Sequence, residues 1–191
     1  MQFVVGRNLL PRSGVRWFEE VLQMPTFAHT DTLTFEGYAA ATWPSLFRRA
    51  YLLAGNHADA EDLAQQTLIK VHGAWSRVSQ SDVPDAYVRR ILTNTFLSSK
   101  RPKGRRLELL VGDDAPEPVS PLSAGPEDRM ALWPHVCELP PRQRAVIVLR
   151  YYEQLSEAEI ADVLGCSRGN VKSTAHRALQ NLRTALGQEE G

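Results

Sequence analysis

The chain has 191 residues, of which 43% are hydrophobic and 23% are charged, a composition typical of a soluble globular protein with one ordinary domain or two small ones. Its formal net charge is zero, no aliphatic run approaches the length of a membrane span, and the N-terminus lacks a signal-peptide pattern. Cys137 and Cys166 stand alone, and His135 with Cys137 supplies only part of a metal-ligand set. We therefore expect a cytoplasmic protein with reduced thiols, no cofactor and no metal.

Three helices are predicted between residues 35 and 100. The first covers residues 35–54, with Pro44 expected to kink or restart it, and the Gly55-Asn56 pair ends it. The second runs from about Ala58 to Trp75, and its outward face carries Asp62, Gln65, Gln66 and Ile69. After a loop over residues 76–84, the third runs from Asp85 to about Lys100. No strand pattern is found, so the predicted fold class is all-α.

Charge is distributed unevenly along the chain. Residues 86–106 contain seven basic residues and no acid, residues 107–128 contain six acids and no base, and residues 167–187 contain four bases and no acid. The acidic stretch also holds four prolines, so we expect an extended linker between two separate helical units. Basic segments without acids favour a polyanion as the partner.

The second unit is predicted to open at Leu139-Pro140-Pro141, with a helix that reaches about Tyr152. Ser156 and Glu159 have the spacing of a capping box, and the helix that they begin ends at Gly165. Ser167 can cap a last helix that runs to about Leu186.

The last two helices have the spacing of a helix-turn-helix that binds double-stranded DNA. Counted from Glu157, a small residue (Ala161), a glycine (Gly165) and a β-branched residue (Val171) stand fifth, ninth and fifteenth. The inward face of the last helix is Val171, Ala175, Ala178 and Leu182. Its outward face presents Lys172, Ser173, His176 and Arg177 to the major groove. A helical corner with solvated charges is the weaker interpretation.

Separated motifs in both halves of the chain resemble the extracytoplasmic-function (ECF) sigma factors. AEDLAQQTL at residues 60–68 and DAYVRRILTN at residues 85–94 resemble region two. LPPRQR at residues 139–144, the segment 155–165 and GNVKS at residues 169–173 resemble region four. Trp43-Pro44, the YLLAG segment at residues 51–55 and the helix of Tyr87 look most like the actinobacterial SigE-type subgroup.

This resemblance implies a promoter-specificity subunit of bacterial RNA polymerase. It divides the chain into an N-terminal extension (1–34), region two (35–106), a linker (107–128), region four (129–187) and a tail (188–191). The implied polymerase contacts, to the clamp helices, are Asp62, Gln65, Gln66 and Ile69. The implied minus-10 contacts are Tyr87, Arg89, Arg90, Asn94, Lys100, Arg101, Arg105 and Arg106. The implied minus-35 contacts are Arg168, Lys172, Ser173, His176 and Arg177.

The expected partners are the polymerase core, through the clamp of its largest subunit and the flap of the second, and promoter DNA. Whether an anti-sigma factor binds is left open, and neither a membrane nor a small-molecule substrate is expected. The acidic linker is expected to lie in the RNA exit path, although a flexible tether has the same composition. Tyr87 either stacks on the melted duplex or packs on Trp75.

Several residues depart from the family pattern. Thr174, Ala175 and His176 replace commoner residues near the base-reading positions, and Gln66 and Leu68 replace an acid and a phenylalanine. Promoter sequence and clamp contact can therefore differ from those of relatives. Residues 1–34 have no counterpart; the favoured explanation is a true start at Met24, and the alternative is an amphipathic segment at residues 15–22 that contacts a regulator.

Two other classes of function compete with this one. A stand-alone regulator that binds operator DNA explains the helix-turn-helix but leaves the face at residues 62–68 unused. An enzyme is not expected, because the sequence has no glycine-rich phosphate loop, no metal-ligand constellation and no grouped nucleophile and base.

Overall fold

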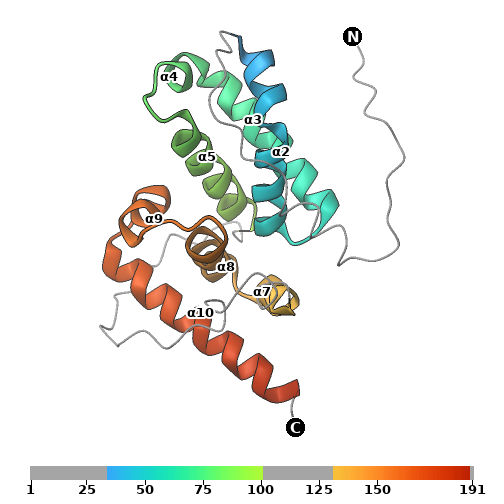
Figure 1. Ribbon diagram of the computed structural model, residues 1–191, viewed down its shortest axis with the longest axis vertical. Helices are drawn as coiled ribbons and strands as arrows, with labels where there is room; N and C mark the ends of the chain where they lie inside the picture. Colours follow the sequence, from blue (N-terminus) through green and yellow to red (C-terminus); the bar gives the residue numbers. More distant parts are fainter. Residues whose placement is uncertain (1–33, 101–130, 190–191) are drawn as a thin grey trace.

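The computed structural model describes residues 34–100 and 131–189, in which every regular element is a helix (Figure 1). The predicted all-α fold is therefore confirmed. The N-terminal extension up to residue 33, the acidic linker and Arg101, Arg105 and Arg106 lie outside the described residues. Within the described ranges no helix is both long enough and apolar enough to cross a bilayer.

The first group of helices contains α2, α3, α4 and α5. Helix α2 (Phe35–Ala54) continues through Pro44 and ends at Gly55, whose φ of 88° is the left-handed conformation that glycine adopts without strain. Helix α3 (His57–Gly73) begins where the side chain of Asn56 accepts a hydrogen bond from the backbone N–H of Asp59 at 2.9 Å.

The predicted end of the second helix was wrong. The backbone leaves the helical conformation at Ala74, and a separate short helix, α4 (Trp75–Ser79), occupies part of the expected loop. Helix α5 (Pro84–Ser99) then begins with a proline in its first turn, where the missing N–H would have had no partner within the helix.

The second group of helices begins with α7 (Trp133–Glu138), which the sequence pattern did not predict. Helix α8 (Pro141–Ile147) follows, and it passes into the π-helix η2 (Val148–Tyr152). Helix α9 (Glu157–Leu164) and the long helix α10 (Arg168–Glu189) complete the chain described here.

The two groups are the two helical domains that the sequence predicted, and they pack directly against each other. They share one hydrophobic core, which we call the shared core and which combines buried residues of α2, α3 and α5 with buried residues of α7, α8 and α10. Its members include Leu46, Leu53, Leu92, Phe96, Trp133, Val136, Ile147 and Leu179. A second, smaller core lies between α8, α9 and α10. Figure 1 shows α5 reaching down to α8 and α9.

Candidate nucleic-acid and polymerase interfaces

The turn between α9 and α10 has the geometry that the sequence predicted for a helix-turn-helix. The hydroxyl of Ser156 accepts from the backbone N–H of Glu159 at 3.3 Å, and the carboxylate of Glu159 accepts from the backbone N–H of Ser156 at 2.8 Å. The hydroxyl of Ser156 also donates to the carboxylate of Glu159 at 2.6 Å. This hydrogen bond, and then the one from the backbone N–H of Ser156, lower the pKa of Glu159. Gly165 has a φ of 61°, and the hydroxyl of Ser167 accepts from Asn170 N–H at 3.2 Å. The predicted capping box, glycine turn and N-cap are confirmed.

The packing of α10 on the rest of the structure also follows the prediction. Val171, Ala175, Ala178 and Leu182 are all buried, and Val171 and Ala175 belong to the second core together with Ile160 and Ala161 of α9. Small side chains at the helix crossing let the two backbones approach closely. Helix α10 is thereby held at a fixed angle to α9, so its opposite face is presented as a rigid surface.

The outward face of α10 differs from the prediction at one position. Arg168 and Lys172 are exposed, and His176 and Arg177 are half-buried, but the Ser173 residue is only 4% exposed. The hydroxyl of Ser173 donates to the carbonyl of Asn170 at 3.2 Å, as does that of Thr174 at 2.7 Å. A short hydroxyl side chain that bonds to its own helix stays close to the backbone. The expected outward position of Ser173 is therefore corrected.

The outward face of α3 is open. Asp62, Gln65 and Gln66 are exposed, and Ile69 is 72% exposed, the largest value for a big hydrophobic residue among those described. The side-chain amide of Gln65 donates to Glu61 at 3.3 Å, which aligns polar groups along the helix. This face is therefore mainly polar, with Ile69 as its one exposed large hydrophobic side chain.

The predicted minus-10 residues on α5 fall into two groups. Arg90 and Asn94 are exposed, and Lys100 just beyond the helix is exposed and pairs with Asp59 at 3.1 Å. Tyr87 is half-buried and packs against the shared core, to which Trp75 also contributes. The rest of the Tyr87 side chain stays exposed to solvent. Arg89 differs from the others because its side chain is mostly buried and its guanidinium pairs with two carboxylates.

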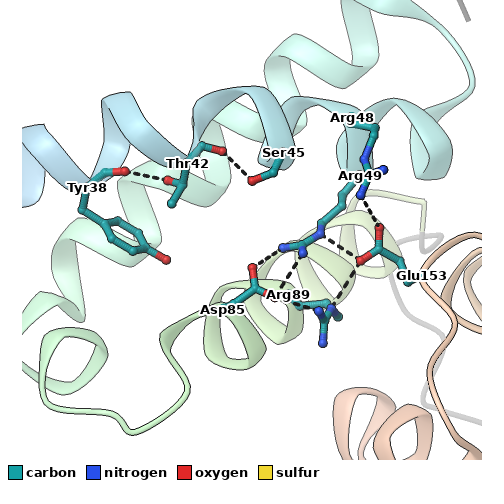
Figure 2. A network of polar contacts seen from close by, with 8 residues as sticks. All are labelled: Tyr38, Thr42, Ser45, Arg48, Arg49, Asp85, Arg89 and Glu153. Carbon is teal, nitrogen blue, oxygen red and sulfur yellow. Dashed lines mark hydrogen bonds and ion pairs between the residues drawn. The ribbon is translucent and has the colours of Figure 1, made fainter. Parts of the chain in front are cut away.

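Arg89 belongs to an ionic cluster between the two groups of helices (Figure 2). Glu153, which follows η2, lies with one oxygen 2.9 Å from Nε of Arg49 and 3.5 Å from Nε of Arg89, and with the other 3.7 Å from Nη2 of Arg48. Asp85 pairs with Arg49 and, at 2.7 Å, with Arg89. Burial alone would lower the pKa of Arg49, but Glu153 and Asp85 outweigh it and raise that pKa.

Comparison with known proteins identifies the family. Residues 40–106 match the model of Sigma-70 region 2, and residues 136–182 match that of Sigma-70 region 4. An RNA polymerase sigma-E factor of Streptomyces avermitilis is 39% identical over 83% of this chain and 88% of its own length. The chain belongs to the sigma-70 family. It is an RNA polymerase sigma factor of the ECF type.

Other relatives of this sigma factor support the same family. The RNA polymerase sigma-E factor of Streptomyces coelicolor is 39% identical over 82% of this chain and 88% of its own. The ECF RNA polymerase sigma factor SigE of Mycolicibacterium smegmatis is 38% identical over 75% of this chain and 58% of its own. A structure of the sigma factor RpoE with the anti-sigma factor NepR from Bartonella quintana has a TM-score of 0.57 and 27% identity, covering 80% of this chain and 96% of that one.

A second polar contact joins region 2 to region 4 in this sigma factor. Arg144 of α8 donates from Nη1 to the carbonyls of Leu53 and Ala54, at 3.1 and 3.2 Å, and from Nη2 to the carbonyl of Cys137. The last carbonyls of α2 have no partner within their own helix, so a cation is favoured there. Burial lowers the pKa of Arg144, with Cys137 opposing this to a smaller extent.

The contacts of Arg49, Arg144 and Glu153 were missed by sequence reasoning. Arg144 stands inside the LPPRQR motif and was assigned only to the resemblance. Glu153 follows a helix with no local pattern that points to region 2. The only available signal was a pair of arginines, Arg48 and Arg49, beside apolar residues on the first helix, where a buried charge requires a partner.

Proposed function

We propose that this sigma factor brings RNA polymerase core to promoters by reading the minus-35 element with α10 and the minus-10 element with α5. One observation favours this over a stand-alone operator-binding regulator. The same chain carries a helix-turn-helix and, on α3, an exposed face of Asp62, Gln65, Gln66 and Ile69. A regulator that never joins polymerase has no use for that face. The chain would act in the cytoplasm as a specificity subunit, without catalysing a reaction itself.

The proposed minus-35 surface is the start and outward side of α10. Arg168 and Lys172 are exposed there and carry charge toward solvent, while His176 and Arg177 keep part of their surface free. Arginine and lysine bind both phosphates and guanine edges in the major groove. Ser173 is buried and contributes little in this arrangement, so the base-reading set is reduced to four residues. Because His176 stands among them, the preferred sequence need not equal that of relatives.

The proposed minus-10 surface follows α5. Asn94 offers a side-chain amide that can hydrogen-bond one base of the non-template strand, and the exposed Arg90 and Lys100 are placed to neutralise phosphates. Tyr87 would stack on the edge of the melted duplex through its exposed part. Arg101, Arg105 and Arg106, outside the described residues, would extend the basic surface.

The proposed domain division is region 2 at residues 35–106 and region 4 at residues 129–187, with an extension at 1–34, the linker at 107–128 and a tail at 188–191. Region 2 would bind the clamp helices of the largest polymerase subunit, region 4 the flap of the second, and the acidic linker the RNA exit path. The relative from Bartonella quintana was solved with an anti-sigma factor, and we propose that a protein of this class also binds the present chain.

Co-elution and run-off transcription test this function together. The chain should elute with purified core polymerase and direct transcription from a subset of genomic DNA, which also gives the promoter sequence. Changing Asp62 and Gln65 to alanine should weaken binding to polymerase and leave duplex binding intact. Changing Lys172 to alanine should do the reverse, so each variant controls for the other. A chain that binds DNA but does not elute with core polymerase would support the regulator instead.

Promoter opening is tested separately through Asn94. In Asn94→Ala, polymerase binding should remain, because Asn94 lies on α5 and the proposed docking face lies on α3. Permanganate reactivity of thymines in the minus-10 region should fall, because the proposed base contact is lost. Normal melting in this variant would remove Asn94 from the proposed mechanism.

A further inference from the structure

The ionic cluster of Figure 2 joins three arginines of region 2 to one carboxylate of region 4. Arg48 and Arg49 come from α2 and Arg89 from α5; we call these three residues the arginine cluster. Glu153 pairs with all three, at 3.7, 2.9 and 3.5 Å, and its side chain is only 4% exposed. Glu153 therefore covers the arginine cluster when the two regions are packed together.

Separating the two regions would leave the arginine cluster with an excess of positive charge. Asp85 stays with the cluster because it lies on α5, but it is one carboxylate against three guanidinium groups. Even in the packed arrangement, Nε of Arg48 and Nε of Arg89 make no hydrogen bond that would satisfy them. A phosphodiester offers more acceptor oxygens than one carboxylate, and the guanidinium fork binds phosphate in two-point fashion.

We propose that the arginine cluster is a binding site for the phosphate backbone of DNA, and that Glu153 masks it until regions 2 and 4 separate. The inference rests on the proposed function, because Arg89 shares α5 with Arg90 and Asn94 of the minus-10 surface. It adds Arg48 and Arg49 as phosphate-binding residues and makes Glu153 an internal competitor of DNA. The packed arrangement and DNA binding at this site exclude each other, because the carboxylate of Glu153 lies where a phosphate would bind the three arginines.

The first experiment measures binding of the full chain, without polymerase, to a fluorescein-labelled DNA duplex of random sequence over a range of NaCl concentrations. In Glu153→Gln we expect an affinity for DNA about tenfold higher at low salt. The slope of the log binding constant against log salt concentration should also be steeper by about 1 to 2, because the released arginines neutralise additional phosphates. Glu157→Gln is the matched control, because Glu157 pairs with Arg150 at 3.6 Å within region 4. The DNA affinity of this variant should equal that of the wild type.

The gain must also depend on the arginine cluster. Adding Arg48→Ala and Arg89→Ala to Glu153→Gln should return affinity and salt dependence to the wild-type values or below. A Glu153→Gln variant that binds no tighter than the wild type overturns the proposal. A gain that survives loss of both arginines overturns it as well, because the extra phosphates would then be bound elsewhere.

A reversible cross-link provides a test within one variant and guards against misfolding. A Cβ added at Gly55 would lie 3.1 Å from Sγ and 3.6 Å from Cβ of Cys137, so Gly55→Cys can form a disulfide that ties the end of α2 to α7. The φ of 88° at Gly55 strains this variant, which is why oxidised and reduced forms of the same protein are compared. Cys166→Ser removes the other thiol of the chain.

The variant tested combines Gly55→Cys, Cys166→Ser and Glu153→Gln. Its reduced form should show the gain in DNA affinity, and its oxidised form should lose that gain. Equal affinities in the two forms, with the disulfide verified by mass spectrometry, overturn the proposal. So does failure of the disulfide to form in a folded chain, because the regions would then not be packed as described. Polymerase is absent throughout, so failure of co-elution would reject the proposed function while leaving these results to be judged separately.

Discussion

Replacing Arg49 with methionine should strongly destabilise the fold, because Arg49 is the central cation between regions 2 and 4. Its Nε donates to Glu153 at 2.9 Å, and its Nη2 donates to Asp85 at 3.0 Å. The side chain of Arg49 is 6% exposed, so solvent cannot replace these partners without separating the helices. Methionine keeps most of the side-chain length and leaves little cavity, so the measured loss reports the charge and hydrogen bonds.

The expected magnitude follows from what remains after the substitution. Removing one partner of a buried ion pair typically costs about 3–5 kcal/mol, because the other charge stays buried without compensation. Glu153 still has Arg48 and Arg89, at 3.7 and 3.5 Å, and the side chain of Asp85 is 42% exposed. Both facts reduce the penalty, so we expect the free energy of unfolding to fall by about 3 kcal/mol, at the lower end of that range.

Urea unfolding followed by tryptophan fluorescence measures this loss. Lys100→Met is the control, because it removes an ion pair with Asp59 whose two side chains are 40% and 49% exposed. An exposed pair contributes about 0–1 kcal/mol and loses that contribution in salt, whereas the loss in Arg49→Met should persist at high salt. If both variants lose the same stability, the buried cluster does not hold the two regions together and the reasoning is wrong.

Three further predictions concern the recognition helix, its turn and the half-buried phenol of Tyr38. Lys172→Ala should weaken duplex binding and lower its salt dependence by about 1, without changing affinity for core polymerase, as measured by fluorescence anisotropy. Gly165→Ala should lower the free energy of unfolding, measured in urea, by about 1–2 kcal/mol, because the φ of Gly165 is 61°. Gly169→Ala, inside α10, should raise it by about 1 kcal/mol. Changes of the same sign in the two variants would contradict this prediction. Burial, and then Asp85, raises the pKa of Tyr38 to about 12. The contribution of the neutral phenol to the free energy of unfolding is therefore complete below pH 10 and is lost as pH rises toward 12. Over that interval Tyr38→Phe should lose less stability than the wild type.

The helix-turn-helix could be predicted in detail because its determinants are local. The capping box joins residues three positions apart, and the glycine turn depends on one dihedral angle. Val171 and Ala175 follow the 3.6-residue period, so their burial could be inferred without knowledge of the rest of the fold. Where the local conformation depends on residues only a few positions apart, side-chain type and spacing are sufficient to predict it.

The helices that were missed or misplaced depend on distant partners. Helix α7 has six residues and a proline, too short for a recognisable period. Its Trp133 stacks on Tyr51 of α2, with ring centroids 6.0 Å apart, and meets Tyr152 edge-on at 5.7 Å. Those two tyrosines lie far from Trp133 and from each other along the chain. No local pattern predicts such a contact, because its partners lie on other helices far along the chain.

The same distinction applies to Arg89, whose ion pairs the charge pattern did not predict. A segment without acids suggested that all its bases were free for phosphate, and this holds for Arg90, which is exposed. Arg89 instead lies between Asp85, one helical turn earlier, and Glu153, from outside the segment. Net charge counted along a sequence is a property of neighbours in the chain, whereas phosphate binding depends on neighbours in space. An arginine in a basic segment is therefore available for DNA only when no carboxylate from elsewhere reaches it, and separation of regions 2 and 4 would change that condition for Arg89 while leaving Arg90 as it is.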